Sequence, residues 1–322
     1  MTRLIILTIV IVLVVAGWTG AWFWGAGQIS AYEKTLEAAD GVTTPKLSCK
    51  SFGVGGWPFG FDLTCTGATV TLADTTVTAS GLKATALVYD PTHVLVFAQS
   101  PVGIADAFTG SQSRVDFKSA EASARLDGWR IGRISVVVEA PVWNDTVLDD
   151  QLIARADHLE AHLVDVPEDH DAKAGLASVA EYAEVDHLSA PGFQVNSGES
   201  TFEGRVTDLP DDVRTYGDPA LLKRWQAAGG KFLLAGFKGD DGDSNFSATG
   251  TLGLDTQGRV EGQLKLNSKG VVERLGDLIP AQLKPVIVGG QAADGSYSQT
   301  VNIAGGVVFT GLVPTAAIPS LY

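Results

Sequence analysis

The chain has 322 residues, enough for one large or two ordinary domains with a sizeable core, so folding does not have to depend on a disulfide. Its 37 glycines, single methionine and 19% charged residues, together with many Thr, Val and Ala, favour a strand-rich fold over a helical bundle. The net charge of −14 repels phosphates, which argues against a nucleic-acid partner and against adsorption of the soluble part to an anionic bilayer.

An uncharged run extends from Leu4 to Trp24, and a helix of that length covers roughly 30 Å, enough to cross a bilayer. Arg3 precedes the run, and four aromatic residues close it like an interfacial belt: Trp18, Trp22, Phe23 and Trp24. The pattern predicts a single-pass anchor with the N-terminus inside and the body outside the cytoplasm. The alternative is a signal peptide cleaved near residues 25–27, although the apolar core of a signal peptide usually holds only about 7 to 15 residues.

We expect three parts in the chain: a membrane anchor at 1–27, a juxtamembrane stalk at 28–41 and a β-rich domain at 42–322. In the stalk, Ile29, Tyr32 and Leu36 recur at helical spacing, so the membrane helix should continue for a turn or two. Alternating β-branched residues then predict a mainly β (α+β) fold, in which an extended, curved antiparallel sheet carries a few covering helices.

The segment 47–67 contains the only two cysteines of the chain. Two short alternating runs flank a glycine-rich turn, which predicts a hairpin with an extended loop. Cys49 and Cys65 lie equidistant from Trp57, so a symmetric register would place them opposite each other, within reach of a disulfide. The alternative is a pair of reduced, buried cysteines in a cytosolic protein.

The turn of this hairpin carries two large aromatic side chains, Trp57 and Phe59, on either side of Pro58. Solvent does not favour two such residues in a glycine-rich loop. They either fold back as a plug on the sheet or form an aromatic lip, at the mouth of an apolar groove or against a bilayer or a partner.

A weak internal repeat marks the middle of the chain, where ARADHLEA at 154–161 recurs as AEVDHLSA at 183–190. The repeat fits a strand unit stacked in one sheet. The segment 151–166 is ambiguous between a helix and a long strand, and 174–182 suggests a short helix. Another helix is predicted at 218–229, with Asp218 as its N-cap, Trp225 on its apolar side and Gly229 at its end.

The clearest hairpin follows at 246–266, where apolar and polar residues alternate on both strands. One face of this hairpin is apolar and is the candidate groove, formed by Phe246, Leu252, Leu254, Val260, Leu264 and Leu266. Beyond it we expect a helix from Val271 to Ile279 ahead of Pro280, an apolar segment at 283–288 and a last strand at 300–310.

The chain shows no catalytic, cofactor or metal motif. His158, Glu160 and His162 lack the H-E-x-x-H spacing of zinc proteases, and on a strand they would line one face as solvated residues or as a surface metal site. The run 240–243 lacks the ligand pattern of an EF-hand and is interpreted as a solvated turn. We therefore predict a protein that is not an enzyme and that uses no cofactor.

Taken together, these motifs resemble an uncharacterised family of bacterial envelope proteins found mainly in alphaproteobacteria. The resemblance is carried by the membrane run, GGWPFGFDLTC at 55–65, the Trp225 helix, TGTLGLDTQGRVEGQLKL at 249–266 and GGVVFTGLVPTAAIPSL at 305–321. It implies an anchor in the bacterial inner membrane, a body in the periplasm and no catalytic residues. More remotely, the hairpin at 249–266 is similar to pieces of AsmA-like and TamB-like proteins, whose curved sheets are thought to hold lipid chains.

These observations favour a membrane-anchored protein that binds or passes a lipid or other amphiphile along the apolar face of its sheet. The alternative is a structural component of the envelope with a closed core and no ligand, with an envelope protein as partner. An envelope hydrolase is a third possibility.

Overall fold

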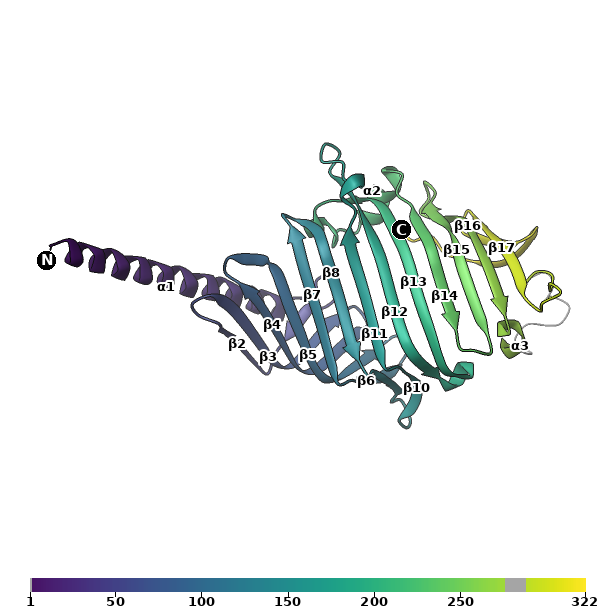
Figure 1. Ribbon diagram of the computed structural model, residues 1–322, viewed down its shortest axis with the longest axis horizontal. Helices are drawn as coiled ribbons and strands as arrows, with labels where there is room; N and C mark the ends of the chain where they lie inside the picture. The colour runs from purple at the N-terminus through teal and green to yellow at the C-terminus, as the bar shows by residue number, and fades with distance from the viewer. Residues whose placement is uncertain (1, 276–287) are drawn as a thin grey trace. The chain divides into compact units, whose positions relative to one another are not determined.

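The computed structural model describes residues 2–275 and 288–322, which form two compact units. Unit 1 comprises Met1–Ser123 with Val142–Gln151, and unit 2 comprises Ala124–Pro141 with Leu152–Tyr322. Strands dominate the chain and the paired strands are antiparallel, as the sequence predicts (Figure 1). Residues 276–279 of the helix expected from Val271 to Ile279, and residues 283–287 of the apolar segment expected at 283–288, lie outside the described residues.

Unit 1 begins with one long helix, α1 (Thr2–Glu37), which runs without interruption through the predicted anchor and most of the predicted stalk. The strands that follow are β1 (Lys46–Ser48), β2 (Ser51–Gly55), β3 (Gly60–Leu72), β4 (Thr75–Leu87), β5 (Asp90–Asp106), β6 (Gln112–Asp116) and β9 (Val142–Asp145). β7 (Ser119–Asp127) crosses the boundary between the units.

The second half of α1 packs against β1, β2 and the start of β3. Trp22 stacks on Phe61, the second residue of β3, with ring centroids 5.5 Å apart. Gly41, just beyond the helix, accepts a hydrogen bond of 2.8 Å from the backbone N–H of Ala73, just beyond the end of β3. The helix and the strand therefore run in the same direction, and the turn between β2 and β3 lies beside the middle of α1.

Unit 2 contains the remaining strands: β8 (Arg130–Glu139), β10 (Gln151–Arg155), β11 (His158–Asp165), β12 (Leu176–Ala190), β13 (Val195–Pro210), β14 (Phe232–Asp240), β15 (Asn245–Leu254), β16 (Val260–Lys269), β17 (Tyr297–Ala304), β18 (Val307–Thr310) and β19 (Val313–Ala317). From β11 to β19, each strand pairs with its neighbour in the sequence. Figure 1 shows β11 to β16 side by side.

The two copies of the internal repeat lie on neighbouring strands. His158 pairs with Asp186 and Ala161 pairs with Ala183, so the copies face each other antiparallel. The ambiguous segment 151–166 forms two strands, β10 and β11, rather than a helix. The helix expected at 174–182 is wrong, because that segment belongs to β12 and its backbone groups pair with β11 and β13.

The short helices of unit 2 lie at strand ends. α2 (Leu221–Ala227) is shorter than predicted and has Ala220, not Asp218, as its N-cap. Its Trp225 is buried and donates an indole hydrogen bond of 2.7 Å to the carbonyl oxygen of Thr207 on β13. α3 (Val271–Leu275) follows β16 directly. The last predicted strand is a hairpin, β17 and β18, because Gly305 and Gly306 turn the chain at positive φ.

Candidate functional site

The predicted groove residues share one face of the β15–β16 hairpin. Leu254 pairs with Val260, Leu252 with Gly262 and Gly250 with Leu264, so the odd-numbered neighbours on β15 point to the other face. The predicted alternation of this hairpin is therefore confirmed. The size of this apolar face depends on the strands that pair with the hairpin on either side.

The same face continues across the neighbouring strands of unit 2. Following the paired residues from strand to strand places apolar side chains side by side. We call this surface the apolar face of unit 2, and it comprises Leu159, Ala161 and Leu163, Val179, Ala183 and Val185, Phe202 and Val206, Phe232, Leu234 and Phe237, Phe246, Ala248, Leu252 and Leu254, Val260, Leu264 and Leu266, and Val301 and Ile303.

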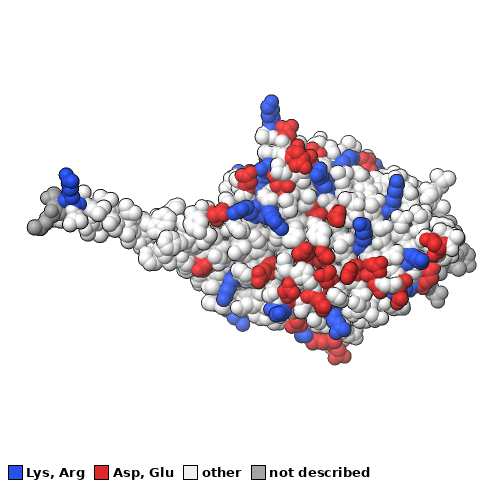
Figure 2. Space-filling model, in the orientation of Figure 1, with Lys and Arg blue, Asp and Glu red and all other residues white. Residues whose placement is uncertain are grey.

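The opposite face of the same strands is polar. It carries His158, Glu160 and His162 on β11, Tyr182 and Glu184 on β12, Glu203 and Arg205 on β13, Thr249 and Thr251 on β15, and Gln263 and Lys265 on β16. Figure 2 shows Asp and Glu side chains, with fewer Lys and Arg, spread over the face of the strands that is turned toward the viewer. Unit 2 therefore has a two-sided sheet, with one face suited to water and the other suited to apolar contacts.

Four phenylalanines form a connected row on the apolar face. Phe202 stacks on Phe232 with centroids 6.2 Å apart and meets Phe237 edge-on at 6.2 Å, and Phe237 meets Phe246 at 4.9 Å. Gly204 makes room for this row, because a Cβ there would lie 3.1 Å from the Phe232 ring and 3.3 Å from the Phe202 ring. The row crosses β13, β14 and β15 and leads to a pocket.

The pocket holds about 440 Å³ and lies at the end of this row. Its apolar lining includes Phe193, Phe237, Phe246 and Val271. A volume of this size suits part of a small ligand, since ligand sites usually measure about 300 to 1,000 Å³.

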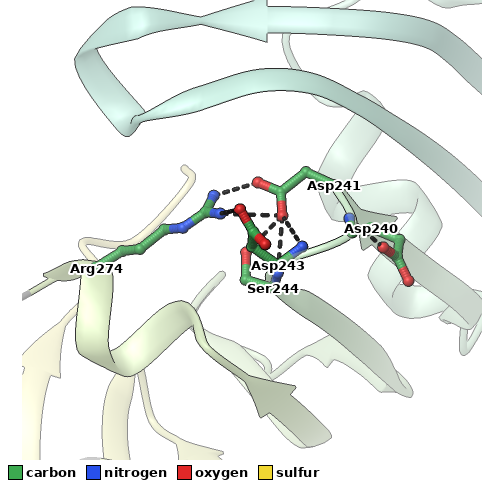
Figure 3. Close-up of polar contacts among 6 residues, drawn as sticks. Asp240, Asp241, Asp243, Ser244 and Arg274 are labelled. Atoms are coloured by element: carbon green, nitrogen blue, oxygen red, sulfur yellow. Dashed lines mark hydrogen bonds and ion pairs between the residues drawn. The ribbon is translucent and has the colours of Figure 1, made fainter.

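An ion pair closes one side of the pocket (Figure 3). Arg274 on α3 binds Asp241 in the turn between β14 and β15, with one contact of 3.1 Å to Oδ1. The same Oδ1 accepts hydrogen bonds from the N–H and hydroxyl of Ser244, at 2.8 and 3.1 Å. Burial opposes ionisation of Asp241, but these hydrogen bonds outweigh it and keep the pKa of the carboxyl below its ordinary value. The run 240–243 is thus a turn held to α3.

One carboxyl interrupts the apolar face. Glu181 on β12 pairs with Leu163 on one side and Gly204 on the other, between Val179 and Ala183 along its own strand. Burial raises the pKa of Glu181, and among the described residues no cation or hydrogen-bond donor offsets this effect. Asp165 also lies on this face, at the end of β11 opposite Val179, but its carboxylate is paired with Arg130 at 3.4 Å.

The apolar face is only partly covered. Val179, Leu254 and Ile303 are buried, whereas Phe237 and Leu266 remain more than a third exposed. Among the described residues, no large side chain is fully enclosed. Apolar side chains are therefore left in contact with solvent in the middle of the face and near the pocket.

The histidines at 158 and 162 do share a face with Glu160, as their alternation predicts. Glu160 Oε2 lies 3.6 Å from Nε2 of His158 and 3.4 Å from Nε2 of His162. A hydrogen bond to Glu139 at 2.9 Å is the main cause that raises the pKa of His158. In the part of the chain that the structure describes, no group of three His, Cys, Asp or Glu side chains could hold a metal ion.

Unit 1 contains the predicted disulfide between Cys49 and Cys65, with Cα atoms 5.4 Å apart. The predicted register is wrong, because Phe52 rather than Cys49 pairs with Cys65. Cys49 lies in the break between β1 and β2, where Lys50 donates its N–H to the carbonyl oxygen of Thr66 at 2.8 Å. This irregular backbone brings Cys49 across to Cys65.

The aromatic residues of the same hairpin are exposed. Trp57 is 51% exposed and Phe59 is 65% exposed, so they do not form a plug on the sheet. The carbonyl oxygens of Pro58 and Gly60 accept hydrogen bonds from the indole N–H groups of Trp18 and Trp22, at 2.9 and 2.7 Å. The loop is thus fixed to α1 by its backbone while its two aromatic side chains remain free.

Sequence reasoning missed Phe237, Phe193 and Glu181. Phe237 joins the apolar face because a bulge between Leu234 and Phe237 shifts the alternation of β14 by one residue. Phe193 lies in a short 3₁₀ turn, Pro191–Phe193, with no periodic pattern around it. The alternation of side chains along β12 places Glu181 on this face, but the sequence of residues 174–182 suggests a short helix.

A family model described as an uncharacterized protein conserved in bacteria (DUF2125) matches residues 22–319. No curated protein and no solved structure is similar enough to be matched. The resemblance to AsmA-like and TamB-like proteins stays a prediction.

Proposed function

The chain belongs to this family of uncharacterised proteins conserved in bacteria, and we propose that it binds a lipid or other amphiphile with the acyl chain on the apolar face of unit 2. We propose no catalytic activity for it. The helix α1 is apolar enough to cross a membrane and would hold the protein there. The disulfide supports a body in the periplasm, because such bonds persist in oxidising compartments.

The observation that carries the proposal is the apolar face, which extends from β11 to β17 around Glu181 and leaves Phe237 and Leu266 exposed. An acyl chain that covered Phe237 and Leu266 would remove apolar surface from water, which contributes about 0.8 kcal/mol for each buried CH₂ group. The row of phenylalanines offers flat, close-packed contacts to such a chain. Gly250 and Gly262 add no side chains above the paired backbones of β15 and β16.

The pocket beside Arg274 suits the end of the ligand. Its phenylalanines would contact the hydrocarbon, and the polar groups of Arg274 and Ser244 at its side would lie next to a hydroxyl or carboxylate. Arg274 is already paired with Asp241, so the site does not present an isolated positive charge. An amphiphile with a small polar end therefore fits better than one with several phosphates.

The test is uptake of a fluorescent fatty acid by the purified full-length chain. Leu266→Glu places a charge on an exposed position of the apolar face and should lower the uptake several-fold without unfolding the protein. Thr249→Glu is the matched control, because it adds the same charge to the polar face of the same hairpin. The contribution of α1 to uptake is the same in both variants.

Equal uptake by Leu266→Glu, Thr249→Glu and the unchanged chain would refute binding on this face. An unchanged chain that takes up no fatty acid beyond that held by α1 would favour a structural role in the envelope instead.

A further inference from the structure

A second surface, in unit 1, points toward the bilayer. Because α1 and β3 run in the same direction, the turn between β2 and β3 lies on the side of unit 1 from which the apolar helix emerges. We define the aromatic loop as residues 56–59. The turn between β4 and β5 lies beside it, since Val88 donates its N–H to the carbonyl oxygen of Phe59 at 3.0 Å.

Large side chains on both turns are exposed. Trp57 and Phe59 project from the aromatic loop at 51% and 65% exposure, and Tyr89 on the neighbouring turn is 75% exposed. On the adjacent helix, Trp18, Phe23 and Trp24 are also exposed. Six aromatic side chains from three segments thus surround the point where the helix meets the sheet.

These turns carry no charge, although the chain has a net charge of −14. No charged residue occurs at 51–61 or at 84–89. Figure 2 shows the apolar part of α1 as a stem without charged side chains along its length, and Arg3 precedes it in the sequence. Repulsion from an anionic bilayer is therefore weak at the aromatic loop itself, and the acidic residues closest to these segments in the sequence are Asp62 and Asp90, directly after them.

The helix gives the depth of the aromatic loop. The carbonyl oxygen of Pro58 accepts a hydrogen bond from the indole of Trp18. Trp18 lies six residues before Trp24, the last residue of the uncharged run, which corresponds to about 9 Å along the helix. If the run from Leu4 to Trp24 fills a hydrocarbon core of roughly 30 Å, the loop lies at or below the level of the head groups. Tryptophan and tyrosine favour this interfacial layer.

We propose that the aromatic loop and the turn at 88–89 insert into the interfacial layer of the bilayer, as a second membrane contact beside α1. The partner is the lipid surface itself, and the proposal requires α1 to cross the membrane but does not require ligand binding by unit 2. The two indole hydrogen bonds to Pro58 and Gly60 fix the loop at its depth. The disulfide between Cys49 and Cys65 closes the hairpin that carries it.

The experiment measures depth with an environment-sensitive fluorophore on the full-length chain in phosphatidylcholine vesicles, with and without brominated acyl chains. Phe59→Cys and Tyr89→Cys each supply one reactive thiol, because the native cysteines are joined. Both labels should show blue-shifted emission and lose most of their fluorescence in the brominated vesicles.

Labels at two further positions serve as controls. Phe108→Cys is the matched control, because Phe108 is 85% exposed in the turn after β5, next to the β3–β4 turn at the other end of the strands. Its label should remain unquenched. Ile9→Cys, within the apolar helix, should be quenched strongly and shows that the chain is inserted.

Labels at 59 and 89 that behave like the label at 108, while the label at 9 is quenched, would overturn the proposal. An unquenched label at 9 would overturn it as well, by removing the membrane helix on which it depends. Neither result would decide whether unit 2 binds a fatty acid.

Discussion

Glu181 is a carboxyl whose chemistry conflicts with its surroundings. It lies among apolar side chains, and burial raises its pKa above the ordinary value of 4.5. A raised carboxyl pKa means that folding favours the protonated form, so stability falls as the pH rises from the ordinary pKa to the pKa in the folded state, and it stays lower above that. Below its ordinary pKa the carboxyl is protonated in both the folded and the unfolded chain, and the effect disappears.

We therefore expect Glu181→Gln to raise the melting temperature at pH 7 and to leave it nearly unchanged at pH 4. The pH dependence separates loss of the buried charge from a general change in packing, which would act at both pH values. Glu184→Gln, on the polar face of the same strand, is the control. A gain at pH 4 equal to the gain at pH 7 would contradict this account of Glu181.

At the scale of elements, the hairpin of β2 and β3 depends on its disulfide and on α1. Replacing Cys49 and Cys65 with Ser should lower the free energy of unfolding by about 2 to 4 kcal/mol, because the bond restricts the unfolded chain across a separation of 16 residues. Chemical denaturation of the oxidised chain and of the double variant measures the difference. Free thiols in the denatured, unreduced protein would show that the bond does not form.

The same hairpin shows what a sequence can and cannot predict. The pairing of the cysteines follows from their number and from the apolar N-terminal run, so it was predictable. The register was not, because Gly53, Gly55 and Gly56 carry no side chains that would fix one alignment over another. The break at Cys49 and Lys50, which brings the two sulfur atoms together, has no signal in the alternation.

The candidate site was also predictable in part. The apolar face of β15 and β16 was predictable because both strands alternate without interruption and face each other across a short turn. The contribution of β14 depends on the bulge before Phe237, and that of β12 depends on its pairing with β11 and β13. Those alignments arise from contacts between segments distant in sequence, so local pattern cannot supply them. The exposure of Trp57 and Phe59 likewise depends on α1, because the indoles of Trp18 and Trp22 hold the backbone of the loop.

At the scale of the whole molecule, each unit has a distinct role in this account. Unit 1 carries the apolar helix, the disulfide hairpin and the exposed aromatic turns, and it would attach the protein to the bilayer. Unit 2 carries the two-sided sheet with its row of phenylalanines and its pocket, and it would hold the amphiphile. The acidic, polar face of that sheet would favour contact with water over contact with an anionic bilayer.

The central claim is that an acyl chain lies on the apolar face of unit 2, and photocrosslinking tests it most directly. The full-length chain is irradiated with a diazirine-bearing fatty acid, and the modified residues are mapped by mass spectrometry. We predict adducts on Phe237, Phe246 and Leu266, together with those on the membrane helix, and none on Thr249 or Lys265 of the opposite face. Adducts confined to α1, or spread equally over both faces of β15 and β16, would contradict the account.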